Sequence, residues 1–415
     1  MLTVSSVILA CLYVITLFYT IFWLLTLVDD RKEERKYPKT PPTVDIIIPA
    51  YNEEEGIKNS MESVLALDYP KEKLHLIVID DGSTDATRAK AEEVKAKHKD
   101  RNITIISQKN MGKYKAMNAA LLHAKGELFA CLDGDSFIDP GALKEMVPYL
   151  HGNVAIVLPL MKVTNPKNFL QKIQFHEYLV NMFYKRIMSY LNCIHVAPGP
   201  FSLYRRKVVD ELGGFKEGHK TEDLEMALRI QNAQYKIVQL LDAIVYTNPP
   251  DNLKDLYYQR KRWNMGSVLN AWDYRAMMLK RDYGDFGMFQ LPIVLSAGFI
   301  SLLLILLILI ENIIHPLYEV WVKFSLIDFD IITLIRNFVF NYSLLDINYY
   351  KLIVMSIIFL VSSLIFWNAH KFTKEHITKH GLIPLIGFMF FYYILLGVVW
   401  MGVTISLIAR RRASW

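Results

Sequence analysis

The sequence predicts an α/β domain with a mostly parallel sheet, flanked by N-terminal and C-terminal transmembrane α-helices. Between residues 29 and 285, short apolar runs alternate with helical patterns, which is typical of a parallel sheet covered by helices on both faces. Outside that region lie long stretches without any charged residue. Hydrophobic residues make up 53% of the 415 residues, which excludes both intrinsic disorder and a chain that is soluble throughout.

The apolar stretches define the expected domain organisation. Residues 1–28 carry no charge and end at a run of charged residues, which predicts a membrane helix. A cleaved signal peptide would have a basic start and a shorter apolar core. We therefore expect an N-terminal transmembrane helix at 1–28, a cytoplasmic domain at 29–285, and a C-terminal transmembrane region at 286–415 with spans at about 288–310, 352–369 and 382–409.

Basic residues beside the spans indicate the orientation but leave one conflict. The cluster Arg31, Lys32, Arg35 and Lys36 beside the first helix predicts that the middle region is cytoplasmic. The last apolar segment has Lys371, Lys374 and Lys379 before it and Arg410, Arg411 and Arg412 after it, and a single crossing cannot place both groups in the cytoplasm. Two explanations stay open. Proline and glycines split this segment into an interfacial or re-entrant piece plus a span, or the weaker stretch 331–345, which contains Arg336, changes the count.

Four apolar runs in the middle region are expected to be strands, at residues 44–48, 74–79, 103–106 and 128–132. Helical patterns at 85–98 and 115–124 lie between them. In open parallel sheets ligands bind beyond the carboxyl ends of the strands. The polar residues directly after each run are therefore the candidates for a functional site.

Acidic residues follow three of these runs. The first is followed by Tyr51 and Glu53, the second by Asp80 and Asp81, and the fourth by Asp133 and Asp135. Each group alone can be turn or helix-capping chemistry. Carboxylates that converge on one edge repel each other unless a cation or donors offset them, which favours a functional site. The pair Asp133 and Asp135 suits Mg²⁺ or Mn²⁺ bound to a nucleoside diphosphate, and Lys113 adds a positive charge for the same phosphates.

These motifs resemble those of membrane-embedded glycosyltransferases of family 2, the group that includes cellulose, hyaluronan, chitin and poly-N-acetylglucosamine synthases. The resemblance covers residues 44 to about 263 by motif and the flanking segments by arrangement. It implies a Rossmann-like GT-A domain that uses a UDP-sugar and inverts the anomeric carbon. It also implies nucleoside-binding positions at Tyr51, Glu53, Asp80 and Asp81, and a D-x-D motif at Asp133 and Asp135, with Asp135 the more direct metal ligand.

Two later motifs sharpen the resemblance. Thr221-Glu222-Asp223 matches the family's T-E-D segment, which implies Asp223 as the general base and Glu222 as a residue that orients it. Residues 259–263 match Q-x-x-R-W, which implies donor contacts by Gln259 and Arg262 and a sugar platform at Trp263. The structural alternatives are an acidic helix start for the first motif and a membrane-interface anchor for the second.

Two further segments are predicted with alternatives. Residues 168–191 are amphipathic and aromatic, so they form either a helix along the membrane surface beneath the site or a helix packed on the sheet. A second interfacial helix is expected at about 254–280. The segment Pro198-Gly199-Pro200-Phe201 resembles the place where related synthases seat the acceptor, which implies acceptor contacts by Gly199 and Phe201. Cysteine or serine often occupies nearby positions there, and proline does not.

Together these features predict an inverting, metal-dependent glycosyltransferase of the cell membrane with a cytoplasmic catalytic domain. The expected partners are a UDP-sugar, a glycan or lipid acceptor and the lipid bilayer, with Mg²⁺ or Mn²⁺ as cofactor and no nucleic acid; accessory subunits are left open. A processive polysaccharide synthase is favoured. The alternatives are single-sugar transfer to a ceramide or polyprenyl carrier, a transporter, and an inactive nucleotide-binding subunit. Charge-free spans argue against a transporter, and the acids of the two motifs argue against an inactive subunit.

Overall fold

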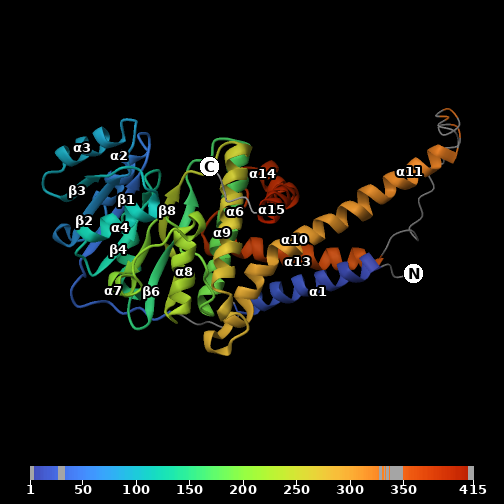
Figure 1. Ribbon diagram of the computed structural model, residues 1–415, viewed down its shortest axis with the longest axis horizontal. Helices are drawn as coiled ribbons and strands as arrows, with labels where there is room; N and C mark the ends of the chain where they lie inside the picture. The colour runs from blue at the N-terminus through green and yellow to red at the C-terminus, as the bar shows by residue number, and fades with distance from the viewer. Residues whose placement is uncertain are drawn as a thin grey trace.

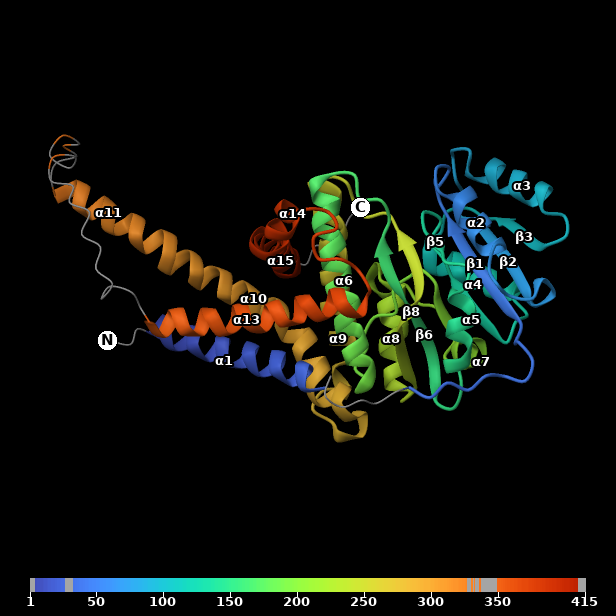
Figure 2. The same ribbon diagram turned by 180° about the vertical axis from the view of Figure 1, so that it is seen from behind.

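The computed structural model describes residues 4–26, 33–326, 330, 332, 336 and 349–409. Several residues used in the orientation argument, Arg31, Lys32 and Arg410 to Arg412, lie outside the described residues. So does most of the weak apolar stretch 331–345. Figures 1 and 2 show the sheet domain at one end of the molecule, α6 and α9 beside it, and the apolar helices beyond these two.

One sheet organises the middle region. Its strands are β1 (Val44–Ala50), β2 (Leu74–Asp80), β3 (Asn102–Ser107), β4 (Leu128–Cys131), β5 (Phe137–Ile138), β6 (Val154–Val163), β7 (Ser202–Arg205) and β8 (Lys236–Thr247). The strand order is β3-β2-β1-β4-β7-β6-β8-β5. The four strands expected from sequence are present and pair in parallel, so the mostly parallel sheet is confirmed.

The parallel register brings the strand ends together. Ala50 at the end of β1 pairs with Asp80 at the end of β2, and Asp80 pairs with Ser107 at the end of β3. Apolar side chains such as Ile46 and Ile48 are fully buried along these strands, because helices cover both faces of a parallel sheet. The polar residues that follow each strand therefore share one edge, as the sequence predicts.

The second half of the sheet is less regular. β7 runs antiparallel to both β4 and β6, whereas β6 and β8 are parallel. The short β5, directly after the D-x-D motif, pairs antiparallel with β8. A mostly parallel sheet with this antiparallel insertion is GT-A-like, and it carries the chain from the D-x-D motif to the later motifs.

Helices cover the two faces of the sheet. One face is covered by α2 (Ile57–Leu65), α3 (Thr87–Lys97), α5 (Ala142–Met146) and α6 (Phe169–Tyr190). The other is covered by α4 (Lys113–His123), α7 (Arg206–Glu211) and α8 (Glu222–Asn232). The two helical patterns predicted from sequence correspond to α3 and α4. Each face has its own cluster of buried apolar side chains, so the sheet is the central layer of three.

The helix α6 (Phe169–Tyr190) packs on the sheet, which is one of the two alternatives for residues 168–191. Asn168 caps its start, where its side chain accepts a hydrogen bond from the Gln171 amide. Phe175 and Leu179 pack into the core on the sheet, whereas Phe183 packs with the apolar helices. The helix therefore packs on the sheet and on the apolar helices at once. The helix α9 (Leu253–Asp273) lies beside α6. Its N-cap is Asn252, whose side chain accepts a hydrogen bond from the Asp255 amide.

The remaining helices are apolar. They are α1 (Val4–Leu25), α10 (Leu291–Leu309), α11 (His315–Leu326), α13 (Tyr349–Phe372), α14 (Leu382–Ile386) and α15 (Tyr392–Ile408). Among the residues that the structure describes, three helical stretches are long and apolar enough to cross a membrane, at Phe286–Leu309, Leu352–Phe372 and Leu382–Ile408, and a shorter apolar helix lies at Ala10–Leu25. Many of their large apolar side chains are exposed, as expected for surfaces that face lipid.

The last apolar segment runs in a different direction from the others. In Figures 1 and 2, α1 and α13 run lengthwise, whereas α14 and α15 are seen end-on. Glycines allow this crossing, because a Cβ atom at Gly402 would lie 2.1 Å from the Tyr257 hydroxyl of α9 and one at Gly397 would lie 2.4 Å from Ile305 of α10. The crosswise course of α15 is therefore fixed by close contacts with both helices.

Candidate active site

Two aspartates at the end of β2 shape the loops of the site. The Asp80 carboxylate accepts hydrogen bonds from the Ser83 amide at 3.0 Å and the Ser107 hydroxyl at 3.2 Å. Asp81 accepts from the Met111 amide at 3.0 Å and the Gly112 amide at 2.9 Å, and both aspartates are buried. Asp81 thereby fixes the loop that leads into α4. At the neighbouring strand end, Tyr51 is 48% exposed, so its ring is accessible to a planar base.

The D-x-D motif packs against Glu53. A Cβ atom at Gly134 would lie 2.9 Å from the Glu53 side chain, so only glycine allows this approach. Burial, followed by the charges of Asp135 and Asp133, raises the pKa of Glu53 to about 7. Burial and the Asp133 charge also raise the pKa of Asp135. The three carboxylates therefore repel one another, which is the arrangement that a bound cation would relieve.

Lys113 joins the two acidic motifs. Its ammonium lies 2.6 Å from the Asp133 carboxylate and 3.5 Å from Glu222 of the T-E-D segment. Burial alone would lower the pKa of Lys113, but Asp133 and Glu222 raise it well above its ordinary value, so the amine stays charged. Because Lys113 is the first residue of α4, the loop held by Asp81 sets the position of this charge.

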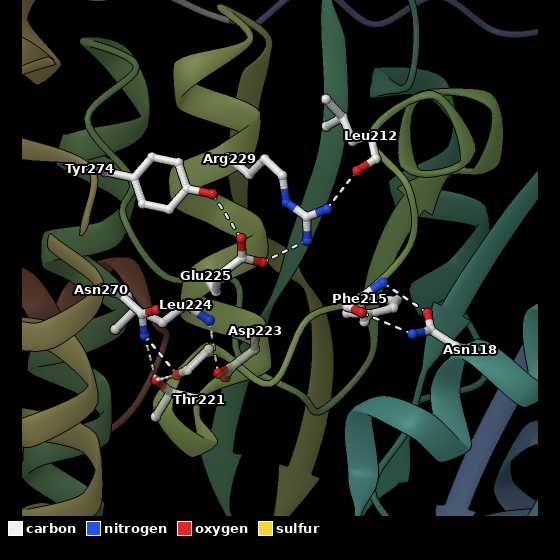
Figure 3. Close-up of polar contacts among 11 residues, drawn as sticks. Asn118, Leu212, Phe215, Thr221, Asp223, Leu224, Glu225, Arg229, Asn270 and Tyr274 are labelled. Carbon is white, nitrogen blue, oxygen red and sulfur yellow. Dashed lines mark hydrogen bonds and ion pairs between the residues drawn. The ribbon is translucent and has the colours of Figure 1, made fainter. Parts of the chain in front are cut away.

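Asp223 is the titratable group expected to act as base. Its Oδ1 accepts a hydrogen bond from the Leu224 amide at 2.8 Å (Figure 3). Burial and the Glu222 charge raise its pKa to about 6, against the opposing effects of Lys113 and Arg262. A carboxylate with this pKa is largely ionised at neutral pH yet basic enough to take a proton.

The segment between α6 and β7 meets the site at one residue. A Cβ atom at Gly199 would lie 2.7 Å from the Lys113 ammonium and 2.9 Å from an Asp133 oxygen. Phe201 is fully buried in the core, and its amide donates to the Cys131 carbonyl at 2.6 Å. Of the two predicted acceptor contacts, Gly199 therefore faces the charged groups, whereas the ring of Phe201 faces the core.

The Q-x-x-R-W motif lies on α9. The Arg262 charge lowers the pKa of Asp223, the residue expected to act as base. The Arg260 guanidinium lies 4.3 Å from the centre of the Trp263 ring and donates two hydrogen bonds to Glu177 of α6, at 2.7 and 3.1 Å. Arg260 also donates a hydrogen bond to the side-chain oxygen of Gln259 at 2.5 Å. The sequence motif predicts that Gln259 contacts the sugar donor. The buried ion pair of Arg260 and Glu177 joins α9 to α6, and the Arg260 guanidinium packs on the ring of Trp263.

The structure thus brings together most of the predicted residues. Close contacts join Lys113, Asp133, Gly199 and Glu222. Electrostatic effects on their pKa values relate Glu53, Asp135 and Asp223 to these groups, and Arg262 to Asp223. Tyr51, Asp80 and Asp81 follow the adjoining strand ends, and Gln259 and Trp263 lie on the helix that carries Arg262. The sequence does not single out Lys185 of α6; burial lowers the pKa of this lysine to about 8, against the opposing effect of the Asp223 charge. No motif marks Lys185, because it lies inside an aromatic amphipathic stretch.

The donor set fits a divalent metal only in part. Within residues 4–26, 33–326 and 349–409, no group of three or more His, Cys, Asp or Glu side chains forms a complete metal site. Asp133 and Asp135 supply carboxylate oxygens, and phosphate oxygens and water are the usual remaining ligands of Mg²⁺. The mutual repulsion of Glu53, Asp133 and Asp135 favours a cation at this position. The residues present therefore fit a metal that binds together with a diphosphate.

A GT-A-like sheet with the D-x-D sequence at its edge and the T-E-D segment beside it is the arrangement expected of a glycosyltransferase domain. In agreement, residues 45–213 match the domain described as Glycosyl transferase family 2. We assign this part of the chain to glycosyltransferase family 2, which confirms the resemblance found in the sequence.

Relatives and a solved structure extend the comparison. The poly-beta-1,6-N-acetyl-D-glucosamine synthase of Staphylococcus aureus (strain COL) is 30% identical over 275 residues, which are 64% of this chain and 63% of that protein. The synthase of the same name from Staphylococcus epidermidis is 29% identical over 226 residues, 54% of each chain. The matches thus span between 54% and 63% of the length of these relatives.

The fold also resembles a solved structure over nearly the full chain. This is the mannosyltransferase PcManGT from Pyrobaculum calidifontis in complex with GDP-Man and Mn²⁺, with a TM-score of 0.64 and 16% identity. The likeness covers 98% of this chain and 97% of that chain. At this identity the comparison supports the fold, including the arrangement of sheet and apolar helices.

Proposed function

We propose that the protein is an inverting, metal-dependent glycosyltransferase that takes a sugar from a UDP-sugar and acts at the membrane. The observation that carries this proposal is the position of Lys113, whose ammonium contacts both Asp133 and Glu222. One side chain thus spans from the expected diphosphate site to the residue beside the expected base. A donor held at Asp133 would present its anomeric carbon toward Asp223.

The proposed reaction is a direct displacement. The Asp223 carboxylate takes the proton of an acceptor hydroxyl, the acceptor oxygen forms a bond to the anomeric carbon, and the bond from that carbon to the diphosphate oxygen breaks. The electron pair of the broken bond leaves with UDP, where Lys113 and Arg262 offset the developing charge. A metal at Asp133 and Asp135 would stabilise the same charge as a Lewis acid. The carbon is inverted because attack and departure occur on opposite faces.

We propose a polymer as the product and N-acetylglucosamine as the first sugar to test. The two Staphylococcus relatives carry the name poly-beta-1,6-N-acetyl-D-glucosamine synthase, and the site lies beside apolar helices, since Leu224 of α8 packs in one cluster with Leu291 and Ile365. The alternative is transfer of a single sugar to a lipid acceptor. Because the solved structure of similar fold contains GDP-Man, GDP-mannose is the competing donor.

To test this, purified membranes that contain the protein are incubated with labelled sugar donors, with and without Mn²⁺. The donors are UDP-N-acetylglucosamine, UDP-glucose and GDP-mannose. We expect metal-dependent incorporation from UDP-N-acetylglucosamine into material of high molecular mass. A single sugar on a lipid would replace the polymer proposal with the lipid alternative. Incorporation from GDP-mannose alone would contradict the UDP-sugar assignment, and the absence of any transfer or UDP release would contradict glycosyltransferase activity.

We further propose that α1, α10 and α13 cross the bilayer while α14 and α15 lie along its cytoplasmic surface. The crosswise course of α15 against α9 and α10 supports this arrangement (Figures 1 and 2). If this segment does not cross the bilayer, the basic groups that precede and follow it in the sequence need not lie on opposite sides, which removes the charge conflict. The proposal differs from the sequence expectation of a span at 382–409.

Cysteine labelling tests this topology. With the exposed Cys11 replaced by serine, cysteines at Thr378 and Ala409 are placed before and after the segment, both at exposed positions. A membrane-impermeant maleimide should label both from the cytoplasmic face in inside-out vesicles and neither in intact cells. Labelling of the two positions from opposite faces would mean that α14 and α15 cross the membrane.

A further inference from the structure

The helix that carries Arg262 and Trp263 is also bound to the segment that carries the expected base. Asn270 lies seven residues after Trp263 on α9. Its side-chain amide donates hydrogen bonds to the Gly218 carbonyl at 2.7 Å and to the Thr221 hydroxyl at 2.9 Å. The Thr221 hydroxyl in turn donates to Gly218 at 2.7 Å. Asn270 is 1% exposed, and Figure 3 shows it facing Thr221, with Asp223 on the other side of that residue.

A glycine makes this contact possible. A Cβ atom at Gly266 would lie 2.3 Å from the Thr221 hydroxyl and 2.6 Å from its methyl group. Gly266 and Asn270 are four residues apart, so they share one face of α9. Thr221 is therefore enclosed between the bare backbone of Gly266 and the amide of Asn270, and it has little freedom to move independently of α9.

A second contact joins the end of α9 to the residues that follow Asp223 in the sequence. The Tyr274 hydroxyl, directly after α9, donates to Glu225 at 2.7 Å (Figure 3). The other oxygen of Glu225 accepts from Arg229 at 2.6 Å, and Arg229 also donates to the Leu212 carbonyl at 2.6 Å. Asp223 thus lies between Thr221 and Glu225, two residues that are both held by the end of α9.

Asp223 itself has few bonds that fix it. Its Oδ1 accepts from the Leu224 amide, and within the part of the chain that the structure describes no hydrogen bond to its Oδ2 is present. An unpaired oxygen is what a base needs for an acceptor hydroxyl, but it leaves the carboxylate to be positioned by its neighbours. The flanking contacts of α9 therefore determine where this oxygen points.

We propose that Asn270 is a positioning residue for Asp223, so that α9, which carries the expected acceptor contact Trp263, also fixes the position of the expected base on α8. This inference rests on the proposed function, since it concerns the geometry of the same transfer reaction. Its consequence is that Asn270 supports transfer to the acceptor without supporting donor binding. A displacement of about 1 Å in a reacting group can cost about 100-fold in rate. Removing the hydrogen bonds of Asn270 to Gly218 and Thr221, here called the clamp of α9 on Thr221, is therefore expected to lower the rate of transfer measurably.

The test compares Asn270→Ala with the wild-type protein in detergent or liposomes. UDP-N-acetylglucosamine serves as donor and N-acetylglucosamine oligosaccharides serve as the acceptor probe. Elongated oligosaccharide and free N-acetylglucosamine are measured in the same sample, because their ratio reports transfer against hydrolysis by water and does not depend on how much protein is folded. UDP affinity and the thermal unfolding midpoint are measured for each variant.

Asn270→Ala is expected to lower transfer by about 10-fold to 100-fold and to shift the ratio toward hydrolysis, with UDP affinity within about twofold of wild type. The matched control is Asp273→Asn on the same helix. Asp273 pairs with His219 of the same segment at 2.9 Å, but both side chains are exposed, so its loss should leave the ratio unchanged.

The outcomes separate this inference from the proposed function. If Asn270→Ala lowers transfer, hydrolysis and UDP binding together, Asn270 only stabilises the fold and the inference is wrong. The inference also fails if Asn270→Ala leaves the ratio unchanged while Asp223→Asn is inactive. If Asp223→Asn itself retains transfer, the proposed function fails first, independently of Asn270.

Discussion

Replacing Asp223 with asparagine is expected to abolish sugar transfer while UDP binding remains. A positioned general base contributes about 10²–10⁴-fold to the rate, and asparagine keeps the shape of the side chain but cannot accept the proton of the acceptor hydroxyl. The donor contacts at Asp133 and Lys113 do not involve Asp223 directly. Initial rates of transfer and calorimetric UDP affinity, measured on the same preparation, check both parts of the prediction.

The pH dependence of transfer gives an independent measure of the same residue. Asp223 acts as a carboxylate, and its pKa is raised to about 6 by burial and by Glu222. The rate should therefore rise with pH, reach half its maximum near pH 6, and fall about tenfold for each unit of pH below that value. The profile is measured at saturating metal, so that titration of Glu53 does not contribute. A rate that stays constant from pH 4 to pH 8 would contradict the assignment of Asp223 as the base.

Replacing Asp135 with alanine is expected to remove most metal-dependent UDP binding and to lower the rate by about 100-fold or more. Asp135 would contribute a carboxylate oxygen to the proposed metal site, and its pKa is raised by burial and then by the Asp133 charge, which a cation would offset. The measurement is UDP affinity by calorimetry as Mn²⁺ is titrated in. The matched control is Asp100→Ala, which removes an exposed carboxylate paired with Lys71 at 2.8 Å and should change neither quantity.

Protons should compete with the metal in the same experiment. The pKa of Glu53 is about 7, and that of Asp135 is also raised, so Mn²⁺ affinity should increase as the pH rises through neutrality. If a chelator and Asp135→Ala both leave UDP binding and transfer unchanged, the protein works without a metal at the D-x-D motif. Lys113 would then remain as the cation for the diphosphate.

The first half of the fold was predictable because its signals are local. Each of β1 to β4 is a short apolar run closed by polar residues, and helical patterns between the runs require a parallel sheet. The second half was not predicted. β7 is four residues long and antiparallel to both neighbours, and its place between β4 and β6 depends on pairing between residues far apart in the chain.

The candidate site was predictable to the extent that its residues follow strand ends or form motifs. Asp133, Asp135, Asp223 and Arg262 were found in this way, but the contacts between them were not. Lys113 lies between Asp133 and Glu222, which are 89 residues apart in the sequence, and only folding brings these three side chains together. Asn270 carries no motif, although its spacing of seven residues from Trp263 puts both on one face of α9.

The sequence by itself determined which functional groups the chain contains. These are carboxylates after the strands, the T-E-D segment, the Q-x-x-R-W motif and apolar helices on both sides of the sheet domain in the sequence. Composition and local periodicity are enough for this, because they reflect burial and backbone preference within each element. Only the tertiary structure decided how these parts act together, namely the Lys113 bridge, the clamp of α9 on Thr221 and the crosswise course of α15. Those features depend on close packing at glycines, and atomic fit between distant segments cannot be read from either segment alone.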